Sequence, residues 1–375
     1  MYNRLYVHVP FCREKCHYCA FVSSPPGKGE LQEYPLLLLT ELRHHEPEQL
    51  DSIYFGGGTP SLLEPQQLAR LLAGIASHCG ISDNAEITLE ANPGTIDTCS
   101  LTGFRDAGIN RLSLGIQSFE DSFLENLGRI HTAGQAREAF REARAAGFEN
   151  ISIDLIHSLP GQDLQQWRSE LLNAVTLSPE HISIYGLTME EGTPFSHTYP
   201  AGSPELADED LAADMFELAD ELLTASGFDH YEIASYARPG RRSQHNSGYW
   251  KRDGYLGLGV AAHSFLRDGN GVRFSNPDTL DDYRSALSAG KPARMNELRL
   301  TRRDAQAEYL FLGLRLSEGI RLPDFARMFD EDLESLHGRA IRELVDLGLL
   351  LRVGTLLTLT RRGMLLSNQV FARFL

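Results

Sequence analysis

The first 230 residues alternate short β-rich runs with helical stretches, and this alternation limits the fold more than any other feature of the sequence. The runs are rich in branched aliphatic and aromatic residues, and each precedes a segment with helical periodicity. Strands joined through helices are parallel, with right-handed crossovers. Six units without a clear seventh predict an α/β fold, an open or partial barrel instead of a closed eightfold one. The expected strands are 4–9, 51–55, 86–91, 111–116, 151–156 and 181–187, and a long helix is expected near 205–226.

The pattern changes near residue 300. Three helical stretches, 304–316, 322–329 and 331–350, precede an apolar run, 350–360, that reads as a hairpin turning at Gly354. Three helices closed by a hairpin predict a winged-helix-like module. The expected domains are therefore 1–230, the partial barrel; 231–297, a connecting region to which we assign no elements; and 298–375, the C-terminal helical module.

Charge and composition limit the partners and the compartment. The 375 residues carry a formal net charge of −16, which opposes sequence-independent binding to a phosphate backbone, so no nucleic-acid partner is expected. No signal peptide and no run of 18 apolar residues is recognisable. Five cysteines without an export signal indicate a reducing compartment, where clustered thiols serve metal or redox chemistry. We expect a cytoplasmic protein.

Three of the five cysteines stand in eight residues directly after the first strand. Cys12, Cys16 and Cys19 have the spacing C-x3-C-x2-C. Four cysteines usually hold an iron–sulfur cluster, so three would leave one iron open for chemistry. A zinc site completed by His17 or His8 is the alternative that spacing alone leaves open. Cys79 and Cys99 stand alone and are interpreted as structural.

Polar residues follow at the ends of successive expected strands, where an α/β barrel binds its ligands. Gly56, Gly57 and Gly58 allow backbone amides to approach a ligand, and Thr59 adds a hydroxyl group. A single polar residue at a strand end usually has its hydrogen bonds satisfied within the fold. Polar residues at the same end of several successive strands instead indicate a binding site. The later candidates are Glu90, which could accept from a ribose or an ammonium group, and Gln117, Arg129 and Asp154.

The cysteine motif resembles that of the radical S-adenosylmethionine (SAM) superfamily, C-x3-C-x-aromatic-C, with Tyr18 at the aromatic position. The resemblance implies a partial (β/α)6 TIM-like barrel of the radical SAM type and a [4Fe–4S] cluster. It also implies that SAM chelates the open iron, and that an electron donor reduces the cluster so that SAM is cleaved to a deoxyadenosyl radical. SAM would then occupy the coordination position that a fourth cysteine would otherwise fill.

The whole chain from Tyr6 onward is similar to the branch that contains oxygen-independent coproporphyrinogen III dehydrogenase and the HemW-type haem chaperones. By this resemblance, Tyr6, Tyr18, Gly57, Gly58, Thr59 and Glu90 would surround SAM, and Gln117, Arg129 and Asp154 match positions that hold a second SAM in the dehydrogenase. Ser158 departs from the pattern, because relatives usually have glycine there.

Two departures favour the chaperone group. The dehydrogenase has a further cysteine where this chain has Phe21, and it has a sizeable segment before the cluster. The stretch "HNSGYW", 245–250, also matches the H-N-x-x-Y-W motif associated with haem binding in the HemW family. His245 is therefore the expected haem ligand, with His263 as another candidate, and Tyr249 and Trp250 offer flat faces to a macrocycle. A structural aromatic loop is the alternative.

The resemblance implies a haem chaperone that passes haem to a respiratory haem protein, with possible peripheral membrane contact. The alternative within porphyrin metabolism is the radical decarboxylation of porphyrinogen propionates.

Overall fold

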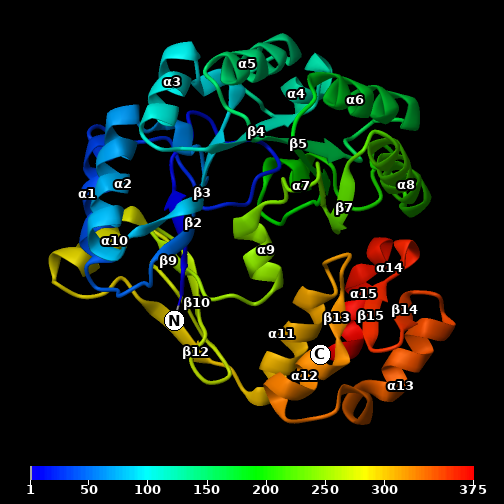
Figure 1. Ribbon diagram of the computed structural model, residues 1–375. Coiled ribbons are helices and arrows are strands. Elements are labelled where there is room, and N and C mark those ends of the chain that lie inside the picture. Colours follow the sequence, from blue (N-terminus) through cyan, green and yellow to red (C-terminus); the bar gives the residue numbers. More distant parts are fainter. Residues whose placement is uncertain (1) are drawn as a thin grey trace.

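The computed structural model describes residues 2–375, and its first half confirms the α/β prediction. Six strands lie side by side in sequence order, all parallel, and curve into an open barrel (Figure 1). The registers place Tyr6 opposite Tyr54, Tyr54 opposite Thr88, and Glu90 opposite Ser113. The strands are β1 (Arg4–Val9), β2 (Leu50–Gly57), β3 (Ile81–Ala91), β4 (Arg111–Gln117), β5 (Ile151–His157) and β6 (His181–Gly186).

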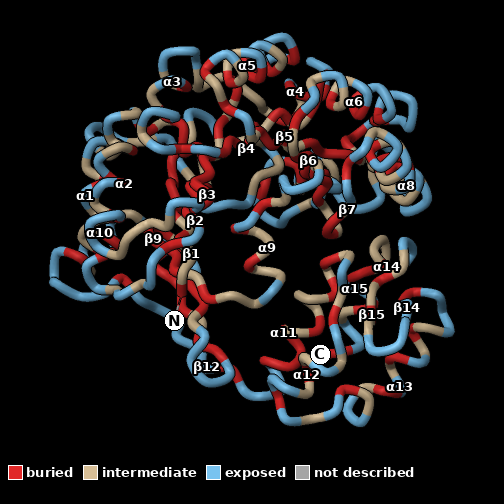
Figure 2. Tube along the Cα trace, viewed as in Figure 1, coloured by how far each residue is buried: buried red, intermediate tan, exposed pale blue. Residues whose placement is uncertain are grey.

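Helices cover the outer side of these strands, with exposed residues along their outward faces (Figure 2). Several begin at capping boxes, as α5 does, where Thr132 and Gln135 each bond the other's backbone amide. They are α1 (Glu30–Leu42), α2 (Pro65–Cys79), α3 (Thr98–Asp106), α4 (Asp121–Asn126), α5 (Ala133–Ala145), α6 (Leu164–Leu177) and α8 (Glu209–Ala225). The short helix α7 (Pro194–Thr198) instead lies against the loop after β1, where Phe195 donates its amide to the carbonyl of His17.

Side-chain alternation gives the barrel an apolar outer layer and a polar interior. Leu5, Val7 and Val9 of β1 are fully buried in the main hydrophobic core, which also includes residues of the surrounding helices. On the other face of the strands, Tyr54 reaches Glu90, and Arg111 lies beside Glu86. A barrel interior lined by polar groups is suited to holding a charged ligand.

The segment without assigned elements extends the barrel sheet at both edges. Strand β9 (Leu256–Leu258) pairs in parallel with β1, whereas β8 (Ser235–Ala237) pairs antiparallel with β6 and with β7 (Asp229–Glu232). A small antiparallel sheet follows, formed by β10 (His263–Leu266), β11 (Val272–Ser275) and β12 (Met295–Arg299). Helices α9 (Gln244–Trp250) and α10 (Leu280–Ser288) complete the region.

The C-terminal residues form a module with its own hydrophobic core, which includes Leu310, Phe325, Ile341 and Leu357. The three expected helices are present, and the hairpin turns at Gly354, whose φ is +60°. The elements are α11 (Arg302–Gly313), β13 (Ile320–Arg321), α12 (Leu322–Phe329), α13 (Leu333–Asp346), β14 (Leu350–Val353), β15 (Leu356–Leu359), α14 (Arg361–Leu365) and α15 (Ser367–Phe371). Among residues 2–375, no helix is both long and apolar enough to cross a membrane.

Glu41 of α1 connects the barrel to the segment that follows β9. Its carboxylate accepts hydrogen bonds from the amide of Gly259 at 2.8 Å, the side chain of Asn276 at 2.6 Å and the hydroxyl of Tyr283 at 2.5 Å. Burial raises the pKa of Glu41 from 4.5 to about 7, although the hydrogen bonds oppose this shift.

We predict that Glu41 makes the folded state less stable as the pH rises. Because its pKa is higher in the folded chain than in the unfolded chain, the folded state binds the extra proton, and this stabilisation is lost between pH 4.5 and 7. The loss should be on the order of 3 kcal/mol. In urea unfolding across this pH range, the free energy of unfolding should fall less in Glu41→Gln than in the unmodified protein. An identical pH dependence in the variant and the unmodified protein would contradict the assignment.

Candidate functional site

The cysteine loop leaves the carboxyl end of β1 and is fixed at several points. Its two ends are joined where Cys12 donates its amide to the carbonyl of Ser24 and Ser24 donates to that of Pro10. In the middle, His17 donates its amide to Leu127, which follows α4. The loop is therefore held against the mouth of the barrel.

The three cysteines face one cavity of about 330 Å³ at the carboxyl ends of the strands. The hydroxyl of Thr59 lies 3.5 Å from the sulfur of Cys12, and a guanidinium nitrogen of Arg129 lies 3.4 Å from that of Cys16. Residues from five of the six strands and their following loops line it: Gly57, Gly58, Thr59, Glu90, Asn92, Ser113, Gly115, Gln117, Arg129, Asp154 and Tyr185, together with Tyr18 and Phe21 of the loop. The predicted site residues therefore meet in one place, except for Tyr6 and His245.

The glycines at the end of β2 are required by space. Gly57 has φ +108°, and a Cβ there would come within 2.5 Å of the His8 ring. A Cβ on Gly58 would lie 2.6 Å from the carbonyl oxygen of Phe11, next to the first cysteine. Side chains at either position would push the strand away from the cysteine loop.

Glu90 is a partly buried carboxylate that a neighbouring tyrosine orients. The hydroxyl of Tyr54 donates to one oxygen at 2.7 Å and the amide of Gly57 donates to the other at 3.3 Å. Burial raises the pKa of Glu90 to about 7, helped by the charge of Asp154. A cationic ligand would favour its ionised form, because an opposite charge offsets the desolvation.

Arg129 and Asp154 give the cavity charges of both signs. The second guanidinium nitrogen of Arg129 donates to the carbonyl of Gly115 at 2.6 Å, which fixes the side chain beside Cys16. Burial also raises the pKa of Asp154, whose carboxylate accepts from the hydroxyl of Ser113. A zwitterionic ligand would find a partner for each of its charges here.

Tyr6 lies beneath the cavity and is not among the residues that line it. Its ring stacks on Tyr54 at 6.2 Å between centroids, and its hydroxyl bonds His8 Nδ1 at 3.2 Å. The other nitrogen of His8 bonds the carbonyl of Val22, so this histidine is not free to complete a zinc site. His17 lines a separate hollow with Phe195. Within residues 2–375, no three His, Cys, Asp or Glu side chains converge as a single metal ion would require.

The donor set instead fits a larger centre. Three thiols around one cavity, with a guanidinium and a hydroxyl group beside two of the sulfurs, can hold a thiolate cluster and offset part of its negative charge. Phe21, which takes the place of a fourth cysteine, lies at the rim and is 67% exposed.

Ser158 adopts a left-handed backbone with φ +59°, a conformation that the glycine expected from the resemblance would adopt without strain. Its hydroxyl bonds the neighbouring His157 ring at 2.9 Å. The departure from the family pattern thus costs backbone strain but adds a local hydrogen bond.

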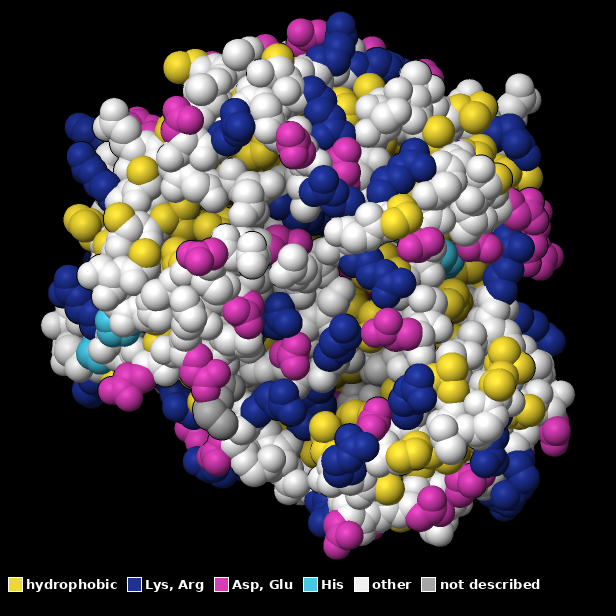
Figure 3. Space-filling view, viewed as in Figure 1, with side chains coloured by type: hydrophobic (Ala, Val, Ile, Leu, Met, Phe, Trp, Pro, Cys, Tyr) yellow, Lys and Arg dark blue, Asp and Glu magenta, His cyan; other side chains and the backbone are white. Residues whose placement is uncertain are grey.

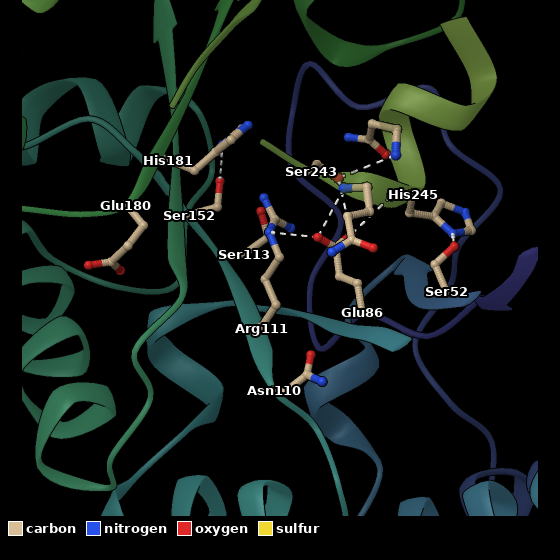
Figure 4. Close-up of polar contacts among 12 residues, drawn as sticks. Ser52, Glu86, Asn110, Arg111, Ser113, Ser152, Glu180, His181, Ser243 and His245 are labelled. Atoms are coloured by element: carbon tan, nitrogen blue, oxygen red, sulfur yellow. Dashed lines mark hydrogen bonds and ion pairs between the residues drawn. The ribbon is translucent and has the colours of Figure 1, made fainter. Parts of the chain in front are cut away.

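His245 lies on α9 and is fully buried (Figure 4). One ring nitrogen bonds the hydroxyl of Ser52 and the other that of Tyr249, both at 2.8 Å. Burial lowers the pKa of His245 to about 3, assisted by Arg4 and Arg111. Neither nitrogen is open to a ligand, so this structure does not support His245 as the haem ligand.

Helix α9 is fixed near the amino ends of the strands, away from the cysteines. The carboxylate of Glu86, in the middle of β3, accepts from the amides of Gln244 and His245 at 3.0 Å each, and Arg111, the first residue of β4, lies 4.0 Å from it (Figure 4). The first residue of the H-N-x-x-Y-W motif, His245, therefore helps to close the barrel at the end where its strands begin.

Comparisons with known proteins agree with this geometry. Residues 6–171 match the Radical SAM superfamily, and residues 300–366 match the HemN C-terminal domain. The chain is 36% identical over 373 residues to the heme chaperone HemW of Lactococcus lactis, covering 100% of this chain and 97% of that protein. The chain belongs to the HemW family of radical SAM proteins. Membership in that superfamily implies a [4Fe–4S] cluster and SAM as cofactors.

Other relatives extend the family across bacteria and mitochondria. Identity is 37% over 325 residues with heme chaperone HemW of Escherichia coli, covering 82% of this chain and 85% of that one. With the mouse mitochondrial radical S-adenosyl methionine domain-containing protein 1 it is 36%, covering 84% and 74%. The fold matches coproporphyrinogen III oxidase (HemN) of E. coli with a TM-score of 0.86 at 23% identity, covering 100% of this chain and 90% of that one.

The sequence analysis missed several polar residues of the site, among them Tyr54, Ser113 and Tyr185 within the strands. Each of these three residues lies inside a strand, where a single polar residue is common and does not by itself indicate a site. Alternation was the available signal, since Tyr54 stands two residues before Gly56 and Ser113 two before Gly115.

We predict that Gly57→Ala destabilises the fold more than Gly29→Ala. Both glycines have positive φ, at +108° and +84°, but an added Cβ meets the His8 ring only at position 57 and nothing within 4 Å at position 29. Overpacking should add roughly 1–3 kcal/mol to the backbone strain common to both. Urea unfolding measures the difference, and equal losses would show that His8 moves aside at no cost.

Proposed function

We propose that the chain is a haem chaperone that holds a [4Fe–4S] cluster through Cys12, Cys16 and Cys19. It binds SAM in the adjoining cavity and delivers haem to an acceptor protein of the respiratory chain. An electron donor reduces the cluster, and the protein works in the cytoplasm, in peripheral contact with the membrane that holds its acceptors. The observation that carries this proposal is the meeting of three thiols and the strand-end residues in one cavity, in a chain of the HemW family.

Each side of the cavity has a task in this proposal. The cysteine loop binds three irons, and the fourth is left for the amino and carboxylate groups of SAM. Glu90, oriented by Tyr54, faces the cationic or ribose part of SAM, while Gly57 and Gly58 let its backbone come close. Gln117, Arg129 and Asp154 bind the remaining polar groups or a second SAM. When bound, the cluster supplies the electron that cleaves the sulfonium.

The deciding experiment is haem titration of the anaerobically reconstituted protein, with and without the cluster, followed by transfer to a haem-free membrane oxidase. The proposal predicts stoichiometric haem binding and recovery of oxidase activity. Coproporphyrinogen III provides the contrasting assay. Its consumption together with release of methionine, deoxyadenosine and a vinyl product would replace the chaperone proposal with a decarboxylase.

We predict that Cys16→Ser abolishes iron incorporation and leaves the barrel folded, because the loop is a peripheral addition to a large core. Iron analysis, the visible absorbance of the cluster and the unfolding midpoint measure the two effects. Cys99→Ser is the matched control, since Cys99 is exposed on α3 and does not line the cavity. Full iron content in Cys16→Ser would contradict the assignment, and zinc in place of iron would favour a structural metal site.

A further inference from the structure

A second cavity, of about 220 Å³, lies between the barrel and the C-terminal module. It is bordered by the end of α9, by the residues before β9, by β10 and β11, and by Leu312 of α11. The other lining residues are Tyr249, Trp250, Arg252, Asp253, Tyr255, Phe265 and Arg273. The second half of the H-N-x-x-Y-W motif therefore faces this cavity, whereas His245 does not line it.

The walls combine aromatic rings with guanidinium groups. The rings of Tyr249 and Tyr255 meet edge to face, with centroids 4.6 Å apart. The guanidinium groups of Arg252 and Arg273 each lie 4.8 Å from the centroid of the Phe265 ring. Such walls favour a flat, unsaturated ligand that carries acidic groups.

The charged side chains around the cavity form shared ion pairs. Glu308 of α11 accepts from Arg252 at 2.9 Å and from Arg273 at 2.7 Å, so one carboxylate serves two cations. Asp253 likewise pairs with both Arg4 and Arg267. Each of these two carboxylates is thus shared by two guanidinium groups, and of the four arginines Arg252 and Arg273 line the cavity. Basic and acidic side chains stand side by side where the barrel meets the C-terminal module in Figure 3.

An accessible imidazole stands beside this cavity. His263 is exposed, and its ring forms no hydrogen bond with the described residues 2–375. It lies on the same face of β10 as Phe265, two residues away, which is about 7 Å along a strand. His263 is therefore open to a ligand, in contrast to His245.

We propose that this cavity receives the carboxylate-bearing edge of haem, with Arg252 and Arg273 binding a propionate and His263 ligating the iron. The inference rests on the proposed function, because haem is the cargo assumed there. The cavity is smaller than a whole macrocycle, so only one edge enters and the iron stays outside, toward His263. Arg252 and Arg273, which share the single carboxylate of Glu308, keep guanidinium N–H groups with which to bind that propionate.

The test compares three ligands: haem, haem dimethyl ester and metal-free protoporphyrin IX. Arg252→Gln and Arg273→Gln should each weaken binding of haem and of protoporphyrin roughly 10- to 100-fold, the effect of losing a hydrogen bond to a charged group. Binding of the ester, which has no carboxylates, should be unchanged. Arg299→Gln on neighbouring β12 is the matched control, since Arg299 is exposed and does not line the cavity.

The iron ligand is tested separately with His263→Ala. Haem affinity and the absorbance band of the imidazole-ligated iron should be lost, whereas protoporphyrin IX, which has no iron, should bind as before. His197→Ala, which removes another exposed histidine, should change neither. An unchanged spectrum in His263→Ala would overturn this ligand assignment.

Different outcomes test the proposed haem chaperone function and the assignment of haem to this cavity. If the unmodified chain binds no haem, both proposals fail. If it binds haem with an affinity that neither arginine variant changes, the pocket assignment alone fails. Equal weakening of haem and ester would show lost packing instead of carboxylate recognition, and would also overturn the assignment.

Discussion

The common direction of the six strands β1–β6 is the constraint on which the site depends. Parallel strands bring their carboxyl ends to one rim, so residues more than a hundred positions apart, such as Cys12 and Asp154, border the same cavity. A single reversed strand would carry its terminal residue to the opposite end. The right-handed crossovers, with helices on the outside, maintain this direction.

The two ends of the barrel have different physical roles. The end at which the strands finish is open, and the carboxylates of Glu90 and Asp154 and the guanidinium group of Arg129 line its cavity. The opposite end, where the strands begin, is closed by α9. The first amides of α9 donate to the buried carboxylate of Glu86, and the His245 ring bonds the hydroxyl of Ser52. Tyr54 lies between them, because its ring packs against His245 at 5.3 Å and its hydroxyl bonds Glu90. The position of α9 therefore bears on the geometry of the cofactor cavity.

The H-N-x-x-Y-W motif divides along these lines. Its histidine is part of the closed end of the barrel, with both ring nitrogens in hydrogen bonds, whereas Tyr249 and Trp250 face the second cavity beside Arg252 and Arg273. His245 and Tyr249 are four residues apart on the same face of α9, and the hydrogen bond between them joins the closed end of the barrel to the second cavity. In our interpretation, the histidine holds the helix and the aromatic residues meet the cargo.

The sequence by itself determined the α/β class, the six parallel units, the C-terminal module and the cysteine loop. These depend on local periodicity and on motif spacing, which a single chain displays directly. The same reasoning identified most of the strand-end residues that line the first cavity. Only the tertiary structure decided that Tyr6 lies beneath that cavity, that His245 is buried, and that Tyr54 orients Glu90. It also brought Arg273 of β11 and Glu308 of α11 to α9. Such facts depend on which distant side chains compete for the same hydrogen bonds, and packing settles that competition only when the whole chain has folded.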